Sequence, residues 1–152
     1  VVFGDGQDDV TAFLNVDPLT AGQWAERHRL AYTTYMDLSG KPEVADLIRK
    51  EVAGINDLLE EHERVRRFVL LYKLLDADDD ELTRTGKVRR AAIRAKYAPI
   101  VDALYDGSQQ VRVHATFRYQ DGQEQHMDTD VQIHRADSPA PVTAPRARQV
   151  TA

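Results

Sequence analysis

Cysteine is the first absence in this 152-residue chain. Without it, the protein can form no disulfide, no thiolate zinc site and no cysteine nucleophile. Long apolar runs are also missing, and none approaches the roughly 20 residues of a membrane-spanning helix, so we expect no transmembrane segment. A formal net charge of −5 disfavours nucleic acid and anionic membranes as partners. What is present, 42% hydrophobic and 30% charged residues, is typical of one soluble globular domain.

The sequence also lacks the short motifs that mark common nucleotide and nucleophile sites. It contains neither the GxGxxG dinucleotide fingerprint nor the phosphate-loop lysine motif. Ser39 and Ser108 have no neighbouring base and no elbow motif, so a serine nucleophile has no support. Any catalytic role of this chain must therefore come from other residue types.

The first residues predict a short β-hairpin. Val1 to Phe3 and Thr11 to Val16 are β-type runs, and the turn-forming stretch GDGQDD separates them. The chain thus opens in what resembles the end of a strand. We therefore expect it to be a fragment of a longer protein.

Two helices and a buried strand are predicted next. Asp17 can cap a first helix that begins at Pro18, with Leu19, Trp24 and Leu30 as its buried stripe. Pro42 can begin a second helix, because apolar residues follow it at spacings of three and four: Val44, Ile48, Val52, Ile55 and Leu59. The dense apolar run VRRFVLLYKLL then predicts a strand that is buried on both faces.

Two further helical segments complete the predicted domain. Val88, Ala92, Ile93 and Ala95 fit one helix, Pro99 interrupts it or begins the next, and Gly107 ends the second piece. Strands and helices in this order predict the α+β class, with a small mixed β-sheet flanked by helices.

Residues 110–134 predict an added β-hairpin. Apolar and polar residues alternate on both sides of Asp121-Gly122, and an odd-numbered loop keeps the apolar residues on one face. A five-residue loop would pair Phe117 with Met127, Val113 with Val131 and Val111 with Ile133. The hairpin is assigned to residues 108–135, and the Pro- and Ala-rich residues 136–152 are predicted to be a disordered tail.

Two groups of residues suggest metal binding, and we expect a metal at neither. Asp76, Asp78 and Asp80 match the first positions of a calcium loop, but Glu81 replaces the required glycine and Lys87 the bidentate glutamate. We therefore expect a solvated acidic loop there. His114, His126 and His134 share the polar face of the predicted hairpin, where ordinary cross-strand partners such as Asp130 and Arg118 explain the first two.

The stretch DELTRTGKVRRAAI, Asp80 to Ile93, contains the strongest candidate residue, Lys87. Gly86 permits a left-handed backbone just before it, and Thr85, with Thr83, can fix the loop through its hydroxyl. Arg89 and Arg90 follow, and their charges would attract an anion to this surface. These residues alone make Lys87 a candidate without naming its ligand.

The segment LTRTGKVRR, residues 82–90, resembles the last core motif of the adenylate-forming enzymes. The longer stretch RFVLLYKLLDADDDELTRTGKVRRAAIRAKYAPIVDALYDG is similar to the C-terminal domain of AMP-forming long-chain fatty acyl-CoA synthetases. VVFGDGQDDVTAFLNVD likewise resembles the strand–turn–strand that opens that domain. The resemblance covers residues 1–107; Arg84 departs from it, standing where the branch commonly has proline, and the hairpin lies outside the shared core.

The resemblance implies a function in two steps. A fatty acid carboxylate attacks the α-phosphate of ATP to give acyl-AMP and pyrophosphate, and the thiol of coenzyme A then takes the acyl group. The family's small C-terminal domain is a mobile lid that rotates between the steps and supplies a lysine to the first, which maps onto Lys87. ATP, Mg²⁺ and coenzyme A would be bound mainly by an N-terminal adenylation domain, which is the expected partner of this one.

Three further expectations follow from the resemblance. Residues 1–107 would form the mobile domain, and the fragment alone would have no ligase activity. The full-length enzyme would be bacterial and cytoplasmic, with peripheral attachment to a membrane left open. Two alternatives also remain: a fatty acyl-AMP ligase that delivers to an acyl carrier protein, and a non-enzymatic α+β binding module that docks through the basic helix from Arg89 to Lys96.

Overall fold

The computed structural model describes residues 1–118 and 123–137 of the chain, and of Phe117 and Arg118 only the backbone. The predicted disorder of the tail therefore falls, for residues 138–152, outside the described part. Ala136 is described, is buried, and donates its backbone N–H to the Arg66 carbonyl at 3.0 Å. The ordered domain thus extends at least to this residue.

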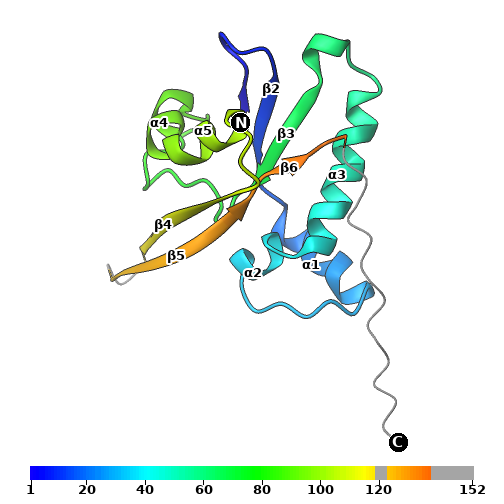
Figure 1. The fold of residues 1–152 in the computed structure, drawn as a ribbon. Helices are drawn as coiled ribbons and strands as arrows, with labels where there is room; N and C mark the ends of the chain where they lie inside the picture. Colours follow the sequence, from blue (N-terminus) through cyan, green and yellow to red (C-terminus); the bar gives the residue numbers. More distant parts are fainter. Residues whose placement is uncertain (119–122, 138–152) are drawn as a thin grey trace, which may run out of the picture.

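A mixed four-stranded sheet forms the centre of the domain, with strand order β1-β2-β3-β6 (Figure 1). Strand β1 (Val2–Phe3) pairs antiparallel with β2 (Val10–Leu14), which confirms the predicted N-terminal hairpin. Strand β2 pairs parallel with β3 (Val65–Leu70), and a parallel pair requires a long crossover connection. Here the helices between the two strands make that connection.

The crossover contains α1 (Pro18–Arg27), α2 (Tyr35–Ser39), α3 (Pro42–Asn56) and a 3₁₀ turn, η1 (Glu61–Glu63). The Asp17 side chain accepts the Thr20 N–H at 2.7 Å, so the predicted cap of α1 is confirmed. The predicted buried stripe was partly wrong, because Leu19 is 71% exposed. Ala21 and Ala25 face the core instead, and Trp24 and Leu30 pack at its margin.

Helix α3 begins at Pro42 as predicted, but it ends before the last residue of the apolar pattern that predicted it. Ile55 is 57% exposed, and the helix ends at Asn56 before reaching Leu59. The Asn56 amide explains this end, because it both donates to the carbonyl of Val65 at 2.8 Å and accepts the Val65 N–H at 2.9 Å. A side chain of the last turn thereby fixes the first residue of β3.

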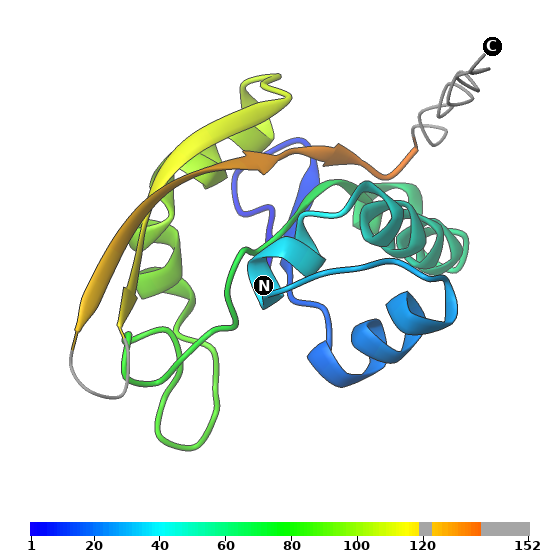
Figure 2. The ribbon, with the colours of Figure 1, turned by 90° about the horizontal axis from the view of Figure 1, so that it is seen from below.

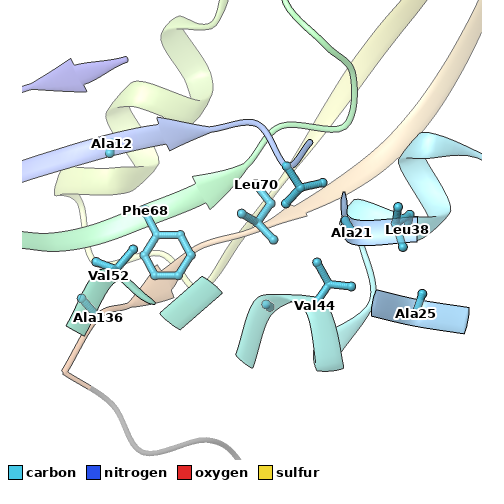
Figure 3. Packing of buried hydrophobic residues seen from close by; sticks show 11 residues of the cluster. Ala12, Ala21, Ala25, Leu38, Val44, Val52, Phe68, Leu70 and Ala136 are labelled. Atoms are coloured by element: carbon cyan, nitrogen blue, oxygen red, sulfur yellow. The ribbon is translucent and has the colours of Figure 1, made fainter. Parts of the chain in front are cut away.

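The sheet is buried on both faces, as the apolar run predicted for β3. Phe68 faces α1–α3, and Figure 3 shows it between Val52, Leu70 and Ala136. Val69 faces the other way, toward α4 (Arg90–Lys96) and α5 (Ala98–Tyr105). Figure 1 shows these two helix groups on opposite sides of the sheet, so the α+β class is confirmed.

The helices after β3 follow their sequence signals closely. Pro99 stands in the first turn of α5 and separates it from α4. Gly107 follows the end of α5 with a φ of +87°, the left-handed conformation that glycine adopts readily at a helix terminus.

Strands β4 (Gln110–Arg118) and β5 (Glu124–Gln132) form the predicted hairpin, but its predicted register was wrong by two residues. Val111 pairs with Val131 and not with Ile133. The parity, and therefore the apolar face, is as predicted. The observed register sets Arg112 against Asp130, whose side chains form a two-point ion pair at 3.0 and 3.3 Å, and His114 against Asp128.

The hairpin is continuous with the central sheet. Directly after β5, β6 (His134–Arg135) pairs antiparallel with β3, with Phe68 opposite His134. Figure 2 shows β5 and β6 as one path that curves from α4 and α5 back to the sheet. Ala115 and Val131 are buried, Val131 in the same cluster as Ile100 and Leu104. The hairpin therefore closes one face of the core. Within the described residues, no helix combines the length and apolar character needed to cross a bilayer.

Candidate active-site loop

Lys87 ends a tight loop that resembles a miniature β-hairpin. Leu82 and Val88 form an antiparallel bridge at its base. Above the bridge, the Thr83 N–H donates to the Lys87 carbonyl at 2.8 Å, and the Lys87 N–H donates to Thr83 Oγ1 at 3.0 Å. The main chain of Lys87 is therefore held at both its N–H and its C=O.

Two neighbouring residues shape the turn, as the sequence predicted. Gly86 has a φ of +79° and donates its N–H to the Thr83 carbonyl at 2.9 Å. An L-residue with a side chain is strained in this conformation, so glycine is required by the backbone and not by lack of space. The Thr85 hydroxyl lies 3.0 Å from that of Thr83, which completes the turn.

The Lys87 side chain is exposed and forms no ion pair with any residue in the described part of the chain. Two cations of the same region differ in this respect. Arg89 pairs with Asp80 at 2.5 Å, and Lys96 pairs with Glu81 at 2.9 Å. Lys87 thus remains available to a ligand, as do the exposed Arg84 and Arg90, whereas Arg89 and Lys96 are paired with acidic groups.

Arg89 and Arg90 separate in space although they are adjacent in sequence. Arg90 lines a cavity of about 600 Å³ between α4 and the β1–β2 turn, together with Arg94 and Gly4. The side chains of the two arginines therefore have different surroundings, and their attraction of an anion stays a prediction. Thr85, Gly86 and Lys87 do form a unit.

A buried carboxylate lies directly beneath the loop, and the sequence analysis missed its role. Glu81 is 0% exposed. Its Oε1 accepts the Tyr97 hydroxyl at 2.5 Å and the Lys96 ammonium at 2.9 Å. Its Oε2 accepts the Asp76 N–H at 3.0 Å and lies 3.1 Å from the Lys73 ammonium. The sequence analysis considered Glu81 only as the residue that replaces the glycine of a calcium loop.

These contacts keep Glu81 ionised. Burial opposes the charge, but hydrogen bonds from Tyr97, Lys96 and Asp76 N–H, and then the charge of Lys73, outweigh it and hold the pKa of the Glu81 carboxyl below its usual value. Burial, followed by the hydrogen bond to Glu81, raises the pKa of the Tyr97 hydroxyl well above its ordinary range. Tyr97 therefore stays a neutral donor.

The acidic run is largely exposed to solvent, as predicted, but several of its carboxylates also contact protein partners. Asp79 pairs with Lys73, Asp80 pairs with Arg89, and Asp76 Oδ1 accepts the Asp78 N–H at 2.9 Å. In residues 1–118 and 123–137, no group of three or more His, Cys, Asp or Glu residues is placed to hold a metal ion. These carboxylates instead fix the chain that leads into the Lys87 loop.

The three histidines predicted on the hairpin do not form a cluster. His114 pairs with Asp128, and His126 Nδ1 lies 3.1 Å from the Thr116 hydroxyl. His134 belongs to β6 and packs against Phe68 of the central sheet, with ring centroids 5.2 Å apart. The predicted facing residues Asp130 and Arg118 were wrong, because the register is shifted by two residues.

Comparison with known proteins gives consistent relatives. Over 107 residues the chain is 30% identical to the long-chain-fatty-acid–CoA ligase FadD15 of Mycobacterium tuberculosis, which is 70% of this chain and 18% of the relative. Over 105 residues it is 34% identical to the putative fatty-acid–CoA ligase fadD11 of the same species, which is 69% of this chain and 18% of the relative. The chain thus spans about a fifth of the length of these curated relatives, and no solved structure matches it.

The family comparison covers the chain up to the start of the β4–β5 hairpin. A family model described as the AMP-binding enzyme C-terminal domain matches residues 1–109. This range contains β1 to α5 and the Lys87 loop, and it ends where the β4–β5 hairpin begins. The chain belongs to the AMP-binding enzyme C-terminal domain family.

Proposed function

We propose that the chain is the mobile C-terminal domain of an AMP-forming long-chain fatty acid–CoA ligase, in which Lys87 supplies the cation for adenylate formation. The observation that carries the proposal is an exposed lysine, free of ion pairs with described residues, on a loop whose main chain is fixed. Membership of the family and relatives named as fatty-acid–CoA ligases support the reaction class.

A lysine suits the first half-reaction for electrostatic reasons. A carboxylate oxygen attacks the α-phosphorus of ATP, a P–O bond forms, and the bond to the pyrophosphate oxygen breaks. Two anions must approach each other, and negative charge accumulates around the phosphorus. An ammonium placed beside these oxygens reduces the repulsion and stabilises the transition state.

The second half-reaction needs no such cation. The thiol sulfur of coenzyme A attacks the acyl carbonyl, the bond to AMP breaks, and the thiol loses its proton. A rotating domain can withdraw Lys87 after the first step, and an exposed loop on a small domain is suited to this movement. ATP, Mg²⁺ and coenzyme A would be bound mainly by the N-terminal adenylation domain, and no residue of this chain is assigned to the metal.

The test compares the two half-reactions in the full-length enzyme. Lys87→Ala should lower the rate of acyl-AMP formation by about 100-fold or more. This rate is measured as the release of pyrophosphate. Thioester formation from preformed acyl-AMP should be nearly unchanged. Lys50→Ala, which removes an exposed lysine on α3, is the matched control and should affect neither step. Equal loss of both half-reactions in Lys87→Ala would contradict the assigned role.

A separate assay identifies the acyl acceptor. The relatives are named as CoA ligases, so free coenzyme A is the expected acceptor. A fatty acyl-AMP ligase would instead transfer the acyl group to a phosphopantetheinyl carrier protein and leave free coenzyme A unreacted. Measuring thioester formation with both acceptors separates the two, and transfer only to the carrier would overturn this part of the proposal.

A further inference from the structure

Glu81 joins two separate segments, the loop after β3 and the junction of α4 with α5, through four partners of its one carboxylate. Lys73 follows β3, the Asp76 N–H belongs to the acidic loop, Lys96 ends α4, and Tyr97 links α4 to α5. Every one of these contacts comes from a donor, and the two oxygens share them equally. A buried charge with this many partners fixes the positions of all the segments that contribute them.

A short chain of backbone contacts connects this carboxylate to Lys87. The Glu81 carbonyl accepts the Arg89 N–H at 2.9 Å. The bridge between Leu82 and Val88 follows, and then the Thr83 N–H bonds the Lys87 carbonyl. The base of the loop is thus fixed where Glu81 is fixed.

We infer that Glu81 is a positioning residue for adenylate formation, which holds the Lys87 loop in the place that the first half-reaction requires. The inference rests on the proposed function of Lys87. Glu81 does not reach the substrates itself; it acts through the backbone of residues 82–88. Misplacement of a reacting group by about 1 Å is enough to cost about 100-fold in rate, so a loosened loop has a direct kinetic consequence.

The contacts explain why a glutamine cannot replace this glutamate. A glutamine has one acceptor oxygen and one donor nitrogen. If the nitrogen replaced Oε1, it would face the donors of Tyr97 and Lys96; if it replaced Oε2, it would face the Asp76 N–H and Lys73. Either orientation breaks two contacts and leaves two lysines without this counter-charge. An aspartate keeps the charge and all acceptor positions on a shorter stem.

The experiment measures both half-reactions in the full-length enzyme carrying Glu81→Gln. We expect kcat for acyl-AMP formation to fall by about 100-fold, with little change in KM for ATP, because the bound substrates are not contacted by Glu81. Thioester formation from preformed acyl-AMP should be nearly unchanged. Glu81→Asp should recover a large part of the lost rate, since it restores the charge.

A control variant separates positioning from general loss of stability. Thr11 is also buried, and its hydroxyl donates to the Tyr105 hydroxyl at 2.9 Å, at the C-terminal end of α5 and not among the partners of Glu81. Thr11→Val removes a buried polar contact of the domain and should leave the ratio of the two half-reactions unchanged. Glu81→Gln should also lose amide protection at Thr83, Gly86 and Arg89 in hydrogen exchange, whereas Thr11→Val should not.

Each outcome decides a different statement. If Glu81→Gln lowers both half-reactions equally, or if Thr11→Val produces the same selective loss, Glu81 is not a positioning residue. If Glu81→Gln does not fold, Glu81→Asp becomes the test. It must then show a smaller loss of the same kind, in acyl-AMP formation and not in thioester formation, together with a smaller loss of amide protection in the loop. If Lys87→Ala is itself unselective, the proposed function fails; if Lys87→Ala is selective and the Glu81 variants are not, only the present inference fails.

Discussion

Acid should destabilise this domain through one partly buried histidine, His134. Its ring lies against Phe68, and β6 places it beside α3. Burial and the positive charge of Arg49, partly offset by Asp46, lower the pKa of His134 from its ordinary 6.5 to about 4. The folded domain therefore favours the neutral imidazole.

The size and sign of the effect follow from this shift. Between pH 6.5 and about 4, the unfolded chain binds a proton at His134 and the folded chain does not, so the free energy of unfolding decreases as the pH falls through this window. One pKa unit corresponds to about 1.4 kcal/mol, so the loss at the acid end is at most about 3 kcal/mol, and solvent screening of the partly exposed ring reduces it. Above pH 6.5 the contribution is fully present.

The assay is urea denaturation of the 152-residue chain at pH 7.5 and pH 4.5. The parent should lose more stability between these conditions than His134→Gln, which cannot be protonated. Phe68→Leu is the control, because it loosens the same ring contact without removing a titrating group and should keep the pH dependence of the parent. An unchanged pH dependence in His134→Gln would refute the reasoning.

Three other changes test the packing and the loop. Phe68→Ala, at a fully buried position, should cost about 3–5 kcal/mol in urea denaturation, and a cost below that of Phe68→Leu would contradict the core assignment. Asn56→Ala removes both bonds to Val65 and should cost about 1–3 kcal/mol by the same measurement; a neutral result would show that the two bonds do not define the helix end. Gly86→Val places a β-branched residue at a φ of +79°, with strain of about 1–3 kcal/mol. In the full-length enzyme it should slow acyl-AMP formation and spare thioester formation, and equal slowing would contradict the role of the loop.

The sequence predicted those features of the site that depend on neighbouring residues. Gly86 predicted the left-handed turn, and Thr85 and Thr83 predicted its side-chain support. Whether Lys87 acts on ATP stays a prediction. The role of Glu81 was missed because its partners are up to 16 residues away, so its local sequence does not show that its carboxylate is buried among them.

The hairpin illustrates the same limit. Alternation predicted β4 and β5 and the face that each residue occupies, because a strand has a period of two. It left open a shift by two residues, which preserves both faces and exchanges only the cross-strand partners. In the observed register, Arg112 and Asp130 lie opposite each other and form an ion pair.

Local signals thus determined the beginning of α1 at Asp17 and Pro18, the beginning of α3 at Pro42, and the end of α5 at Gly107. Each of these depends on hydrogen bonds or backbone angles within a few residues. Only the tertiary structure decided that Phe68 pairs with His134 across β3 and β6, and that the carboxylate of Glu81 is buried among two lysines and a tyrosine. These contacts join segments that are distant in the sequence. They form only when folding brings both partners together and removes them from water, so local sequence patterns do not predict them.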